Sequence, residues 1–332
     1  MSTKLMKVIL GTMEMGRGVD SKQSLEMIQN FMEEGYSDLD TAIMYCGGKT
    51  EKILGEIKMG TNEAVHIATK VNPIGSNSLT EASIRQQFHL SLERLGTKCV
   101  DILYLHMPDH ETDINVSLKA INDLHKEKKF VRFGLSNYAS WQVMEIYSIC
   151  REKAYVLPSV YQGMYNPITR MVEGELFPCL RHLKMVFYAY NPLAGGLLSG
   201  KYSYVDKDSS ELPKTVPKGR FNGVGGRWAS AYRDRFWNKP NFEGIELVKI
   251  ALADSYGEGK VSLVDATMRW LIHHSKLSAD GGDGVIIGAS KMKHFSENVK
   301  SLKNAKPLDK RVVNAFDAAW KLSKPSCPKY YR

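Results

Sequence analysis

Short apolar segments of strand length alternate with helical patterns along almost the whole chain, and this alternation limits the fold more than any other feature. Two of the segments, Val100–Leu105 and Val285–Ile287, are mostly apolar throughout. That pattern is typical of strands buried on both faces of a parallel sheet. The eight segments are Val8–Leu10, Leu39 with its neighbours, Val65–Val71, Val100–Leu105, Phe130–Leu135, Leu157–Tyr161, Met185–Tyr190 and Val285–Ile287.

Apolar residues three and four positions apart predict amphipathic helices between these strands. The stripes are Leu25–Met32 with Gly35 at the expected helix end, Ile84–Leu95 with Gly96, Ile114–Leu124, and Val143–Ile149 with Ser140 as the expected N-cap. An eightfold strand–helix repeat predicts an α/β fold, with the parallel sheet closed as a (β/α)8 TIM barrel. An open doubly wound sheet is the alternative. It would be favoured by a Gly-x-Gly-x-x-Gly turn after the first strand, which Gly11–Gly18 does not have.

Residues 197–242 interrupt this rhythm. The stretch is rich in glycine, proline and tyrosine and contains a basic and aromatic segment at residues 227–237. A long excursion inside a compact domain is more often functional than a plain connection. We therefore expect residues 1–332 to form one domain, with 197–242 as a lid that contacts substrate and cofactor.

Composition narrows the functional classes. Lys and Arg exceed Asp and Glu by 45 to 36, but the basic residues are dispersed, so a nucleic-acid partner is not expected. No apolar run approaches the roughly 18 residues of a membrane helix. Five widely spaced cysteines without a Cys-x-x-Cys pair argue against disulfides and a metal site. Residues 1–5 lack the pattern of a secretory signal, so a cytoplasmic protein is expected.

Polar residues follow the predicted strands, where a barrel carries its active site. They are Asp40 and Tyr45 after the second strand, Lys70 and His106 at the ends of the third and fourth, Ser136 and Asn137 at the fifth, Gln162 after the sixth, Asn191–Lys201 after the seventh and Ser290 after the eighth. Each has a plainer interpretation when taken alone. Asp40 could cap a helix, Tyr45 could pack at the surface, Lys70 could be exposed and His106 could be a core histidine.

Taken together, four of these side chains suit carbonyl reduction by hydride transfer. A tyrosine hydroxyl with a pKa near ~10 needs help to act as both acid and base. A lysine ammonium beside it favours the phenolate, and a carboxylate holds that ammonium charged and in place. A neutral histidine can bind and orient the carbonyl oxygen. Asp40, Tyr45, Lys70 and His106 supply these four groups.

The motifs around these residues resemble those of the aldo-keto reductases over nearly the whole chain. The shared motifs are Leu39–Ala42 with Tyr45, Thr69–Val71, Leu105–His106, Gly134–Tyr138 and Gln162. Longer segments are similar to the branch of aflatoxin aldehyde and succinic semialdehyde reductases. These are Gly11–Gly16, His106–His110, Tyr161–Asn166, Phe177–His182, Asn191–Leu198 and Tyr330–Arg332.

The resemblance implies that the barrel binds NADPH/NADP+ in extended form. By the roles that matching residues have in the family, Tyr45 would be the general acid and Lys70 would lower its pKa. Asp40 would pair with Lys70, and His106 would orient the carbonyl. The cofactor would be held by Ser136, Asn137 and Gln162 at the nicotinamide, by Asn191, Leu193, Gly195 and Lys201 at the pyrophosphate, and by Arg220, Ser290, Lys291, His294 and Asn298 at the adenosine phosphate.

The resemblance also implies NADPH-dependent reduction of aldehydes, and of some diones, to alcohols. Aflatoxin dialdehyde-like, succinic semialdehyde and carboxybenzaldehyde-like substrates are expected, in detoxification or semialdehyde metabolism, by a homodimer. Substrate contacts are expected from Met44, His106, Tyr232 and Arg235, because an arginine fork suits a carboxylate. The alternative is a binding module similar to the potassium-channel β-subunits, which share this barrel and its cofactor.

Overall fold

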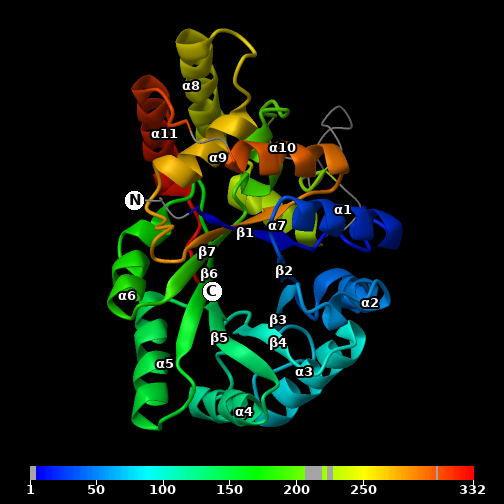
Figure 1. Cartoon of the computed structure of the whole chain (residues 1–332). Coiled ribbons are helices and arrows are strands. Elements are labelled where there is room, and N and C mark those ends of the chain that lie inside the picture. Colours follow the sequence, from blue (N-terminus) through cyan, green and yellow to red (C-terminus); the bar gives the residue numbers. More distant parts are fainter. Residues whose placement is uncertain (1–4, 206–218, 223–226, 304–305) are drawn as a thin grey trace.

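The computed structural model describes residues 5–205, 219–222, 227–303 and 306–332. Its centre is a closed barrel of parallel strands in sequential order, in which β1 pairs with both β2 and β8 (Figure 1). The strands are β1 (Lys7–Gly11), β2 (Asp38–Asp40), β3 (His66–Val71), β4 (Val100–Leu105), β5 (Phe130–Ser136), β6 (Pro158–Met164), β7 (Val186–Tyr190) and β8 (Gly284–Gly288). The predicted (β/α)8 barrel is confirmed and the open sheet is excluded.

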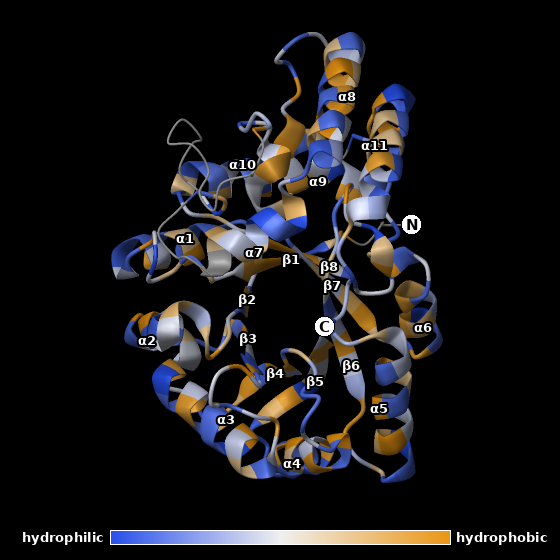
Figure 2. Cartoon of the chain, turned by 180° about the vertical axis from the view of Figure 1, so that it is seen from behind, coloured by the Kyte–Doolittle hydropathy of each residue, from blue (hydrophilic) through white to orange (hydrophobic). Residues whose placement is uncertain are grey.

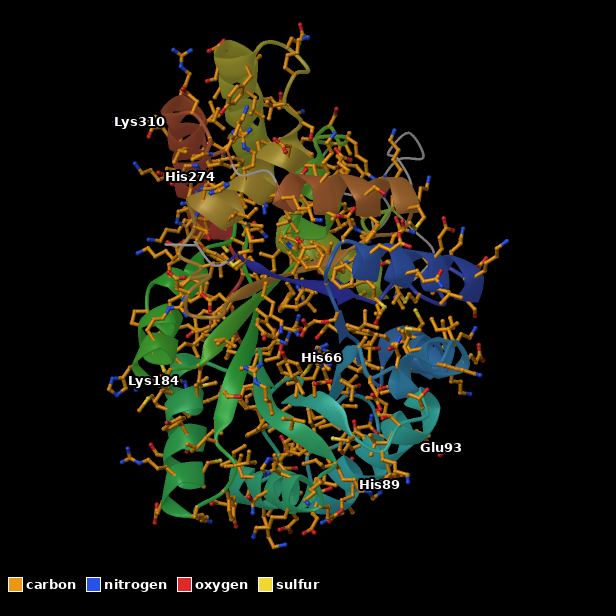
Figure 3. The ribbon with its side chains drawn as sticks, in the orientation of Figure 1. His66, His89, Glu93, Lys184, His274 and Lys310 are labelled. Carbon is orange, nitrogen blue, oxygen red and sulfur yellow. The ribbon has the colours of Figure 1, made fainter. Side chains whose placement is uncertain are left out.

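Helices surround the barrel, and α8 and α11 pack against each other beyond its rim (Figure 1). They are α1 (Ser21–Glu33), α2 (Lys49–Glu56), α3 (Glu81–Leu95), α4 (Ile114–Lys126), α5 (Ser140–Glu152), α6 (Leu176–His182), α7 (Arg227–Phe236), α8 (Lys239–Tyr256), α9 (Leu263–His273), α10 (Met292–Leu302) and α11 (Lys310–Ser323). None of these helices is long and apolar enough to cross a bilayer within the described ranges. Polar side chains such as His89 and Glu93 project outward from α3 (Figure 3).

The helix ends follow from local chemistry. Gly96 adopts φ +66° at the end of α3, a left-handed conformation that glycine reaches without strain. The expectation that Ser140 caps α5 is wrong by one position. Ala139 is the N-cap, and its N–H donates to the side-chain oxygen of Gln142 at 2.9 Å. Ser140 is therefore the first helical residue.

Two apolar layers position the mouth of the barrel. A large core lies between the strands and the surrounding helices. Inside the barrel, a smaller cluster of buried residues fills the cross-section. Hydrophobic residues, in orange, recur along the strand ribbons (Figure 2). The members of the smaller cluster are Ile9, Ala68, Ile102, Tyr104, Val160, Tyr188 and Ile286. Because the interior is packed, the carboxyl ends of the strands form the floor of any site.

The described part of the excursion after β7 begins with a short turn of helix, η4 (Ala194–Ser199), against which α7 packs. Behind α7, Trp237 is fully buried and its ring contacts those of Phe221 and Phe242. Residues 206–218 and 223–226, which belong to the predicted lid, lie outside the described residues. This aromatic packing anchors α7 beside η4, near the mouth of the barrel.

Candidate active site

A buried ion pair joins the carboxyl ends of β2 and β3. Lys70 is fully buried, and its Nζ donates to Oδ1 of Asp40 and to the carbonyl oxygen of Thr41, both at 2.6 Å. The other carboxylate oxygen of Asp40 accepts from Nε2 of Gln162 on β6 at 2.7 Å. Buried charges persist when they are paired and hydrogen-bonded in this way. Asp40 is therefore not a helix cap, and Lys70 is not a surface lysine.

Tyr45 and His106 lie beside this pair. The Nζ of Lys70 is 5.1 Å from the ring centre of Tyr45, and the rings of Tyr45 and His106 meet edge to face at 6.2 Å. Directly after Tyr45, Gly47 and Gly48 have φ of +64° and +89°. These left-handed residues turn the chain from the strand end into α2, a conformation that glycine adopts readily.

Burial sets the protonation of both groups. It raises the pKa of Tyr45 well above its usual value, Asp40 raises it further, and Arg220 opposes the change. Burial, reinforced by the charge of Lys70, lowers the pKa of His106 to about 3. The phenol is protonated and the imidazole neutral at neutral pH.

The net direction for Tyr45 is upward because burial outweighs the charges around it. The expectation that Lys70 lowers this pKa stays a prediction. The ammonium of Lys70 is paired with Asp40 at 2.6 Å, which holds it in place beside the phenol. Burial also lowers the pKa of Lys70 itself, against the opposing effect of Asp40.

Asn137 links three strand ends next to this group. Its φ is +63°, and its Nδ2 donates to the carbonyl oxygen of His106 at 2.9 Å and to the hydroxyl of Ser136 at 3.0 Å. Its Oδ1 accepts from the hydroxyl of Tyr190 at 2.8 Å. Burial raises the pKa of Tyr190 to about 12. Of the three residues expected at the nicotinamide, Ser136 and Asn137 adjoin each other, whereas Gln162 gives its amide nitrogen to Asp40.

The segment after β7 approaches α7 closely. Asn191 has φ +54°, and its Oδ1 accepts from the hydroxyl of Tyr232 at 3.3 Å. Gly195 has φ +69°, and a Cβ there would lie 2.6 Å from the Tyr232 ring, so only glycine fits. Leu193 lies between these two residues, directly before η4.

A cluster of cationic side chains lies where β8 meets α10. Burial and the neighbouring Lys291 lower the pKa of Lys201, and burial, Lys201 and Lys291 lower that of His294. Ser290 is exposed beside this cluster. Asn298, buried in α10, donates to the carbonyl oxygen of Gly288 at 3.4 Å. Lys291 and His294, expected at the adenosine phosphate, thus lie near Lys201, expected at the pyrophosphate.

Arg220 instead turns toward the end of β1. Its Nη1 donates to the hydroxyl of Tyr232 at 2.6 Å, and its Nη2 pairs with Oε1 of Glu14 at 3.0 Å. It also lies beside Gly288 at the end of β8. Sequence reasoning missed Glu14. The only sequence feature that pointed to Glu14 was its position within the motif Gly11–Gly16.

A pocket of about 210 Å³ opens next to Asn137. Its wall contains Met164, Tyr190, Arg235 and the chain end Pro328–Arg332. The N–H of Arg332 donates to the carbonyl oxygen of Asn137 at 3.0 Å. The C-terminal motif Tyr330–Arg332 was the sequence signal for the chain-end part of this wall, and Arg235 is the residue expected at the substrate that lines it.

The other residues expected at the substrate lie outside the wall of that pocket. Met44 is half-buried directly before Tyr45. The hydroxyl of Tyr232 is hydrogen-bonded to Arg220 and Asn191. Within the described chain, no group of three or more His, Cys, Asp or Glu side chains is placed to hold a metal ion.

Comparisons with known proteins agree with this arrangement. The aldo/keto reductase family model matches residues 7–321. Aflatoxin B1 aldehyde reductase member 2 of Mus musculus is 49% identical over 98% of this chain and 87% of its own length. Aldo-keto reductase family 7 member A3 of Homo sapiens is 47% identical, over 98% of this chain and 96% of its own.

A solved structure shares the fold. The crystal structure of an aldo/keto reductase from Klebsiella pneumoniae in complex with NADP and acetate superposes with a TM-score of 0.68 at 19% identity. The match covers 99% of this chain and 94% of that one. The family model and the relatives above show that the chain belongs to the aldo/keto reductase family.

Proposed function

We propose that this protein reduces aldehydes, and some diones, to alcohols with NADPH, in detoxification or semialdehyde metabolism. The observation that carries the proposal is the buried Asp40–Lys70 pair beside a protonated Tyr45 and a neutral His106. Two relatives quoted above share about half of the sequence, and one is named for the reduction of aflatoxin B1 aldehyde. Aflatoxin dialdehyde-like, succinic semialdehyde and carboxybenzaldehyde-like compounds are the proposed substrates.

The geometry assigns a role to each side chain. NADPH supplies the hydride that the carbonyl carbon receives. Tyr45 donates its hydroxyl proton to the carbonyl oxygen, and its raised pKa keeps that proton available at neutral pH, which suits reduction. Lys70, held by Asp40, stabilises the phenolate that remains. Neutral His106 hydrogen-bonds the carbonyl oxygen and orients it.

Polar and cationic side chains among the described residues would hold each part of the cofactor. Ser136 and Asn137 offer polar groups beside the reacting tyrosine, with Gln162 below them on Asp40. Asn191, Leu193 and Gly195 would hold the pyrophosphate. The cationic cluster of Lys201, Lys291 and His294, with Ser290 and Asn298, would hold the adenosine phosphate. Arg220 adds a positive charge between the ends of β1 and β8.

The pocket beside Asn137 would hold the rest of the substrate. Arg235 and Arg332 line it, so a carboxylate at the far end of a short aldehyde would meet a counter-charge there. Such a charge offsets the cost of removing the carboxylate from water. We therefore propose a preference for aldehydes that carry a carboxylate. Met44, Tyr232 and His106 would contact the substrate nearer to the reacting carbonyl.

Steady-state kinetics with NADPH against a substrate panel tests the proposal. The panel contains succinic semialdehyde, 2-carboxybenzaldehyde, an aromatic dione and an aldose. We expect the two carboxylated aldehydes to give the highest kcat/KM. An aldose preferred over all the others would contradict the assignment.

A homodimer and a cytoplasmic location belong to the same proposal, on the strength of the resemblance. Light scattering of the purified protein tests the first, and cell fractionation tests the second.

A further inference from the structure

The Lys70 ammonium lies close to two tyrosine rings. Its Nζ is 5.1 Å from the ring centre of Tyr45 and 5.6 Å from that of Tyr104. Both distances fall within the roughly 6 Å over which a ring face attracts a cation, and the attraction is strongest where water is excluded. Tyr104 is fully buried on β4, two residues before His106. The mechanism above gives Tyr104 no role.

A glycine on the neighbouring strand makes room for this ring. Tyr104 of β4 pairs in register with Gly134 of β5. A Cβ at Gly134 would lie 2.3 Å from Cδ1 of Tyr104, far closer than atoms can approach. The ring therefore lies against bare backbone, and its position depends on the absence of a side chain at Gly134.

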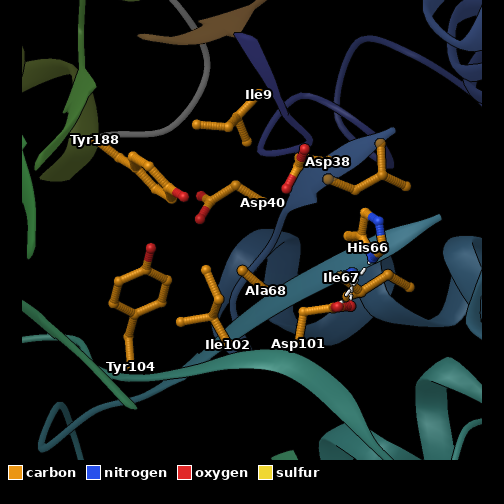
Figure 4. A pocket seen from close by; sticks show the side chains of 11 residues that line it. Ile9, Asp38, Asp40, His66, Ile67, Ala68, Asp101, Ile102, Tyr104 and Tyr188 are labelled. Atoms are coloured by element: carbon orange, nitrogen blue, oxygen red, sulfur yellow. Dashed lines mark hydrogen bonds and ion pairs between the residues drawn. The ribbon is translucent and has the colours of Figure 1, made fainter. Parts of the chain in front are cut away.

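The hydroxyl of Tyr104 faces the carboxylate partner of Lys70. Figure 4 shows the hydroxyls of Tyr104 and Tyr188 and the carboxylate of Asp40 turned toward one another across a small cavity. The cavity measures about 10 Å³, close to the space that one water molecule requires. The Tyr104 hydroxyl is buried and makes no hydrogen bond of regular geometry within the described chain. Buried hydroxyls are rarely left unpaired, so this cavity is a suitable place for a bridging water.

We propose that Tyr104 is a positioning residue for the Asp40–Lys70 pair. Its ring packs against the ammonium of Lys70, and its hydroxyl faces the carboxylate of Asp40, directly or through one water. The consequence for catalysis rests on the function proposed above, because it acts through Lys70 on Tyr45. The effect on Lys70 itself does not depend on that function.

The expected direction follows from the groups around Lys70. Asp40 on β2 and Glu51 on α2 favour its charged form, burial opposes it, and Tyr45 and His106 complete its surroundings. The Tyr104 ring favours the charged form of Lys70 and so opposes the effect of burial. Loss of the ring therefore lowers the pKa of Lys70 further. The ammonium is then lost at a lower pH. The decline of kcat at alkaline pH therefore begins at a lower pH than in the wild type.

Four variants separate the ring from the hydroxyl. Tyr104→Leu removes both, Tyr104→Phe removes only the hydroxyl, and Gly134→Ala displaces the ring without changing it. Tyr188→Phe is the matched control, because it deletes the other hydroxyl at the cavity. The pKa of Lys70 is followed by NMR titration of lysine Cε signals in the protein without cofactor, with the Lys70 signal identified by its loss in Lys70→Met. The pH profile of kcat is measured in parallel.

We expect Tyr104→Leu to lower the titration midpoint of Lys70 by about one pH unit, the size of a buried cation–π contact. The alkaline decline in kcat should move by the same amount. Gly134→Ala should move both in the same direction by less. Tyr104→Phe should leave the midpoint in place and lower kcat by about two- to fivefold, the loss of one hydrogen bond.

An unchanged Lys70 midpoint and pH profile in Tyr104→Leu would overturn the inference. The inference would also be overturned if Tyr104→Leu and Tyr188→Phe lowered kcat equally and neither moved the Lys70 midpoint. That result would indicate an effect of packing alone. Failure of the proposed function gives a different signature. In that case the wild-type protein reduces no aldehyde, or Lys70→Met retains full activity, while the NMR titration still reports on Tyr104.

Discussion

The two sides of the barrel mouth are built differently. On the strand side, the Lys70 and Asp40 side chains are 0% and 5% exposed and joined at 2.6 Å. On the side of the excursion and the chain end, Arg235 is partly exposed, and its guanidinium lies 5.9 Å from the Tyr232 ring centre. The first arrangement holds reacting groups at fixed separations, and the second leaves room for ligands of different shape. In the proposed function, catalysis and recognition would thus fall to different parts of the fold.

The contrast has a structural cause. Asp40 and Lys70 stand on neighbouring strands whose backbones are paired. Across the mouth, the contacts are made by single side chains and by the chain end. Arg233 donates to the carbonyl oxygen of Phe221 at 2.8 Å, and the Arg332 N–H donates to that of Asn137. Changes on the strand side should therefore affect kcat, and changes on the other side should affect binding.

The largest effect is expected at the acid. Tyr45→Phe keeps the ring but deletes its transferable proton, so kcat should fall by about 10²–10⁴. Binding of NADPH, measured by fluorescence quenching, should barely change. Turnover close to the wild type on any aldehyde would show that Tyr45 is not the proton donor.

The next effect belongs to the other side of the mouth. Arg235→Ala should raise KM for succinic semialdehyde by about ten- to a hundredfold, the value of one charged hydrogen bond, with kcat little changed. A neutral aldehyde of similar size should show little change.

Arg233→Ala is the matched control, because Arg233 is held by Phe221 and does not line the pocket. Equal losses for charged and neutral aldehydes in Arg235→Ala would mean that the segment is structural.

A smaller effect should distinguish the cofactors. Lys291→Ala removes a cation from the cluster at the start of α10, and we expect about a tenfold loss of affinity for NADPH. NADH, which lacks the 2′-phosphate, should lose little. Because Arg220 is paired with Glu14, its replacement by alanine should discriminate less between the two cofactors. Fluorescence titrations that show the reverse order would place the 2′-phosphate at Arg220.

The last effect is on stability and its dependence on pH. The pKa of His106 is about 3 in the folded protein and about 6.5 in an unfolded chain. Its contribution is complete above pH ~6.5 and is lost as the pH falls toward 3, by up to about 1.4 kcal/mol per pH unit. Urea unfolding between pH 7 and 4 should therefore show a shallower pH dependence for His106→Gln than for the wild type. Parallel curves would indicate that the pKa of His106 is the same in the folded and the unfolded protein.

Sequence patterns could predict the strand side because its residues are tied to strand ends. Once the eight strands were located, Asp40, Lys70 and His106 had to converge at the carboxyl edge of the barrel. The other side could not be predicted in the same way. Glu14 meets Arg220, and Met164 meets the chain end, only through the placement of loops far apart in the sequence.

The protonation state of Tyr45 could also not be predicted from the sequence alone. A lysine next to a tyrosine suggests a lowered phenol pKa, but the net result also depends on burial and on the nearby charge of Asp40, which both raise the pKa. The role of Tyr104 was hidden for a similar reason. In the sequence it is one residue of a buried strand. Only the register, which places Tyr104 between Lys70 on β3 and Gly134 on β5, shows that its ring reaches Lys70.

Single-turnover oxidation of NADPH by Lys70→Met, followed by absorbance with succinic semialdehyde, tests the central claim most directly. The double variant Asp40→Asn, Lys70→Met guards against a folding defect, because it leaves no unpaired buried charge. We expect both variants to bind NADPH normally and to transfer hydride at least about a hundredfold more slowly than the wild type. Hydride transfer at the wild-type rate in either folded variant would contradict the account.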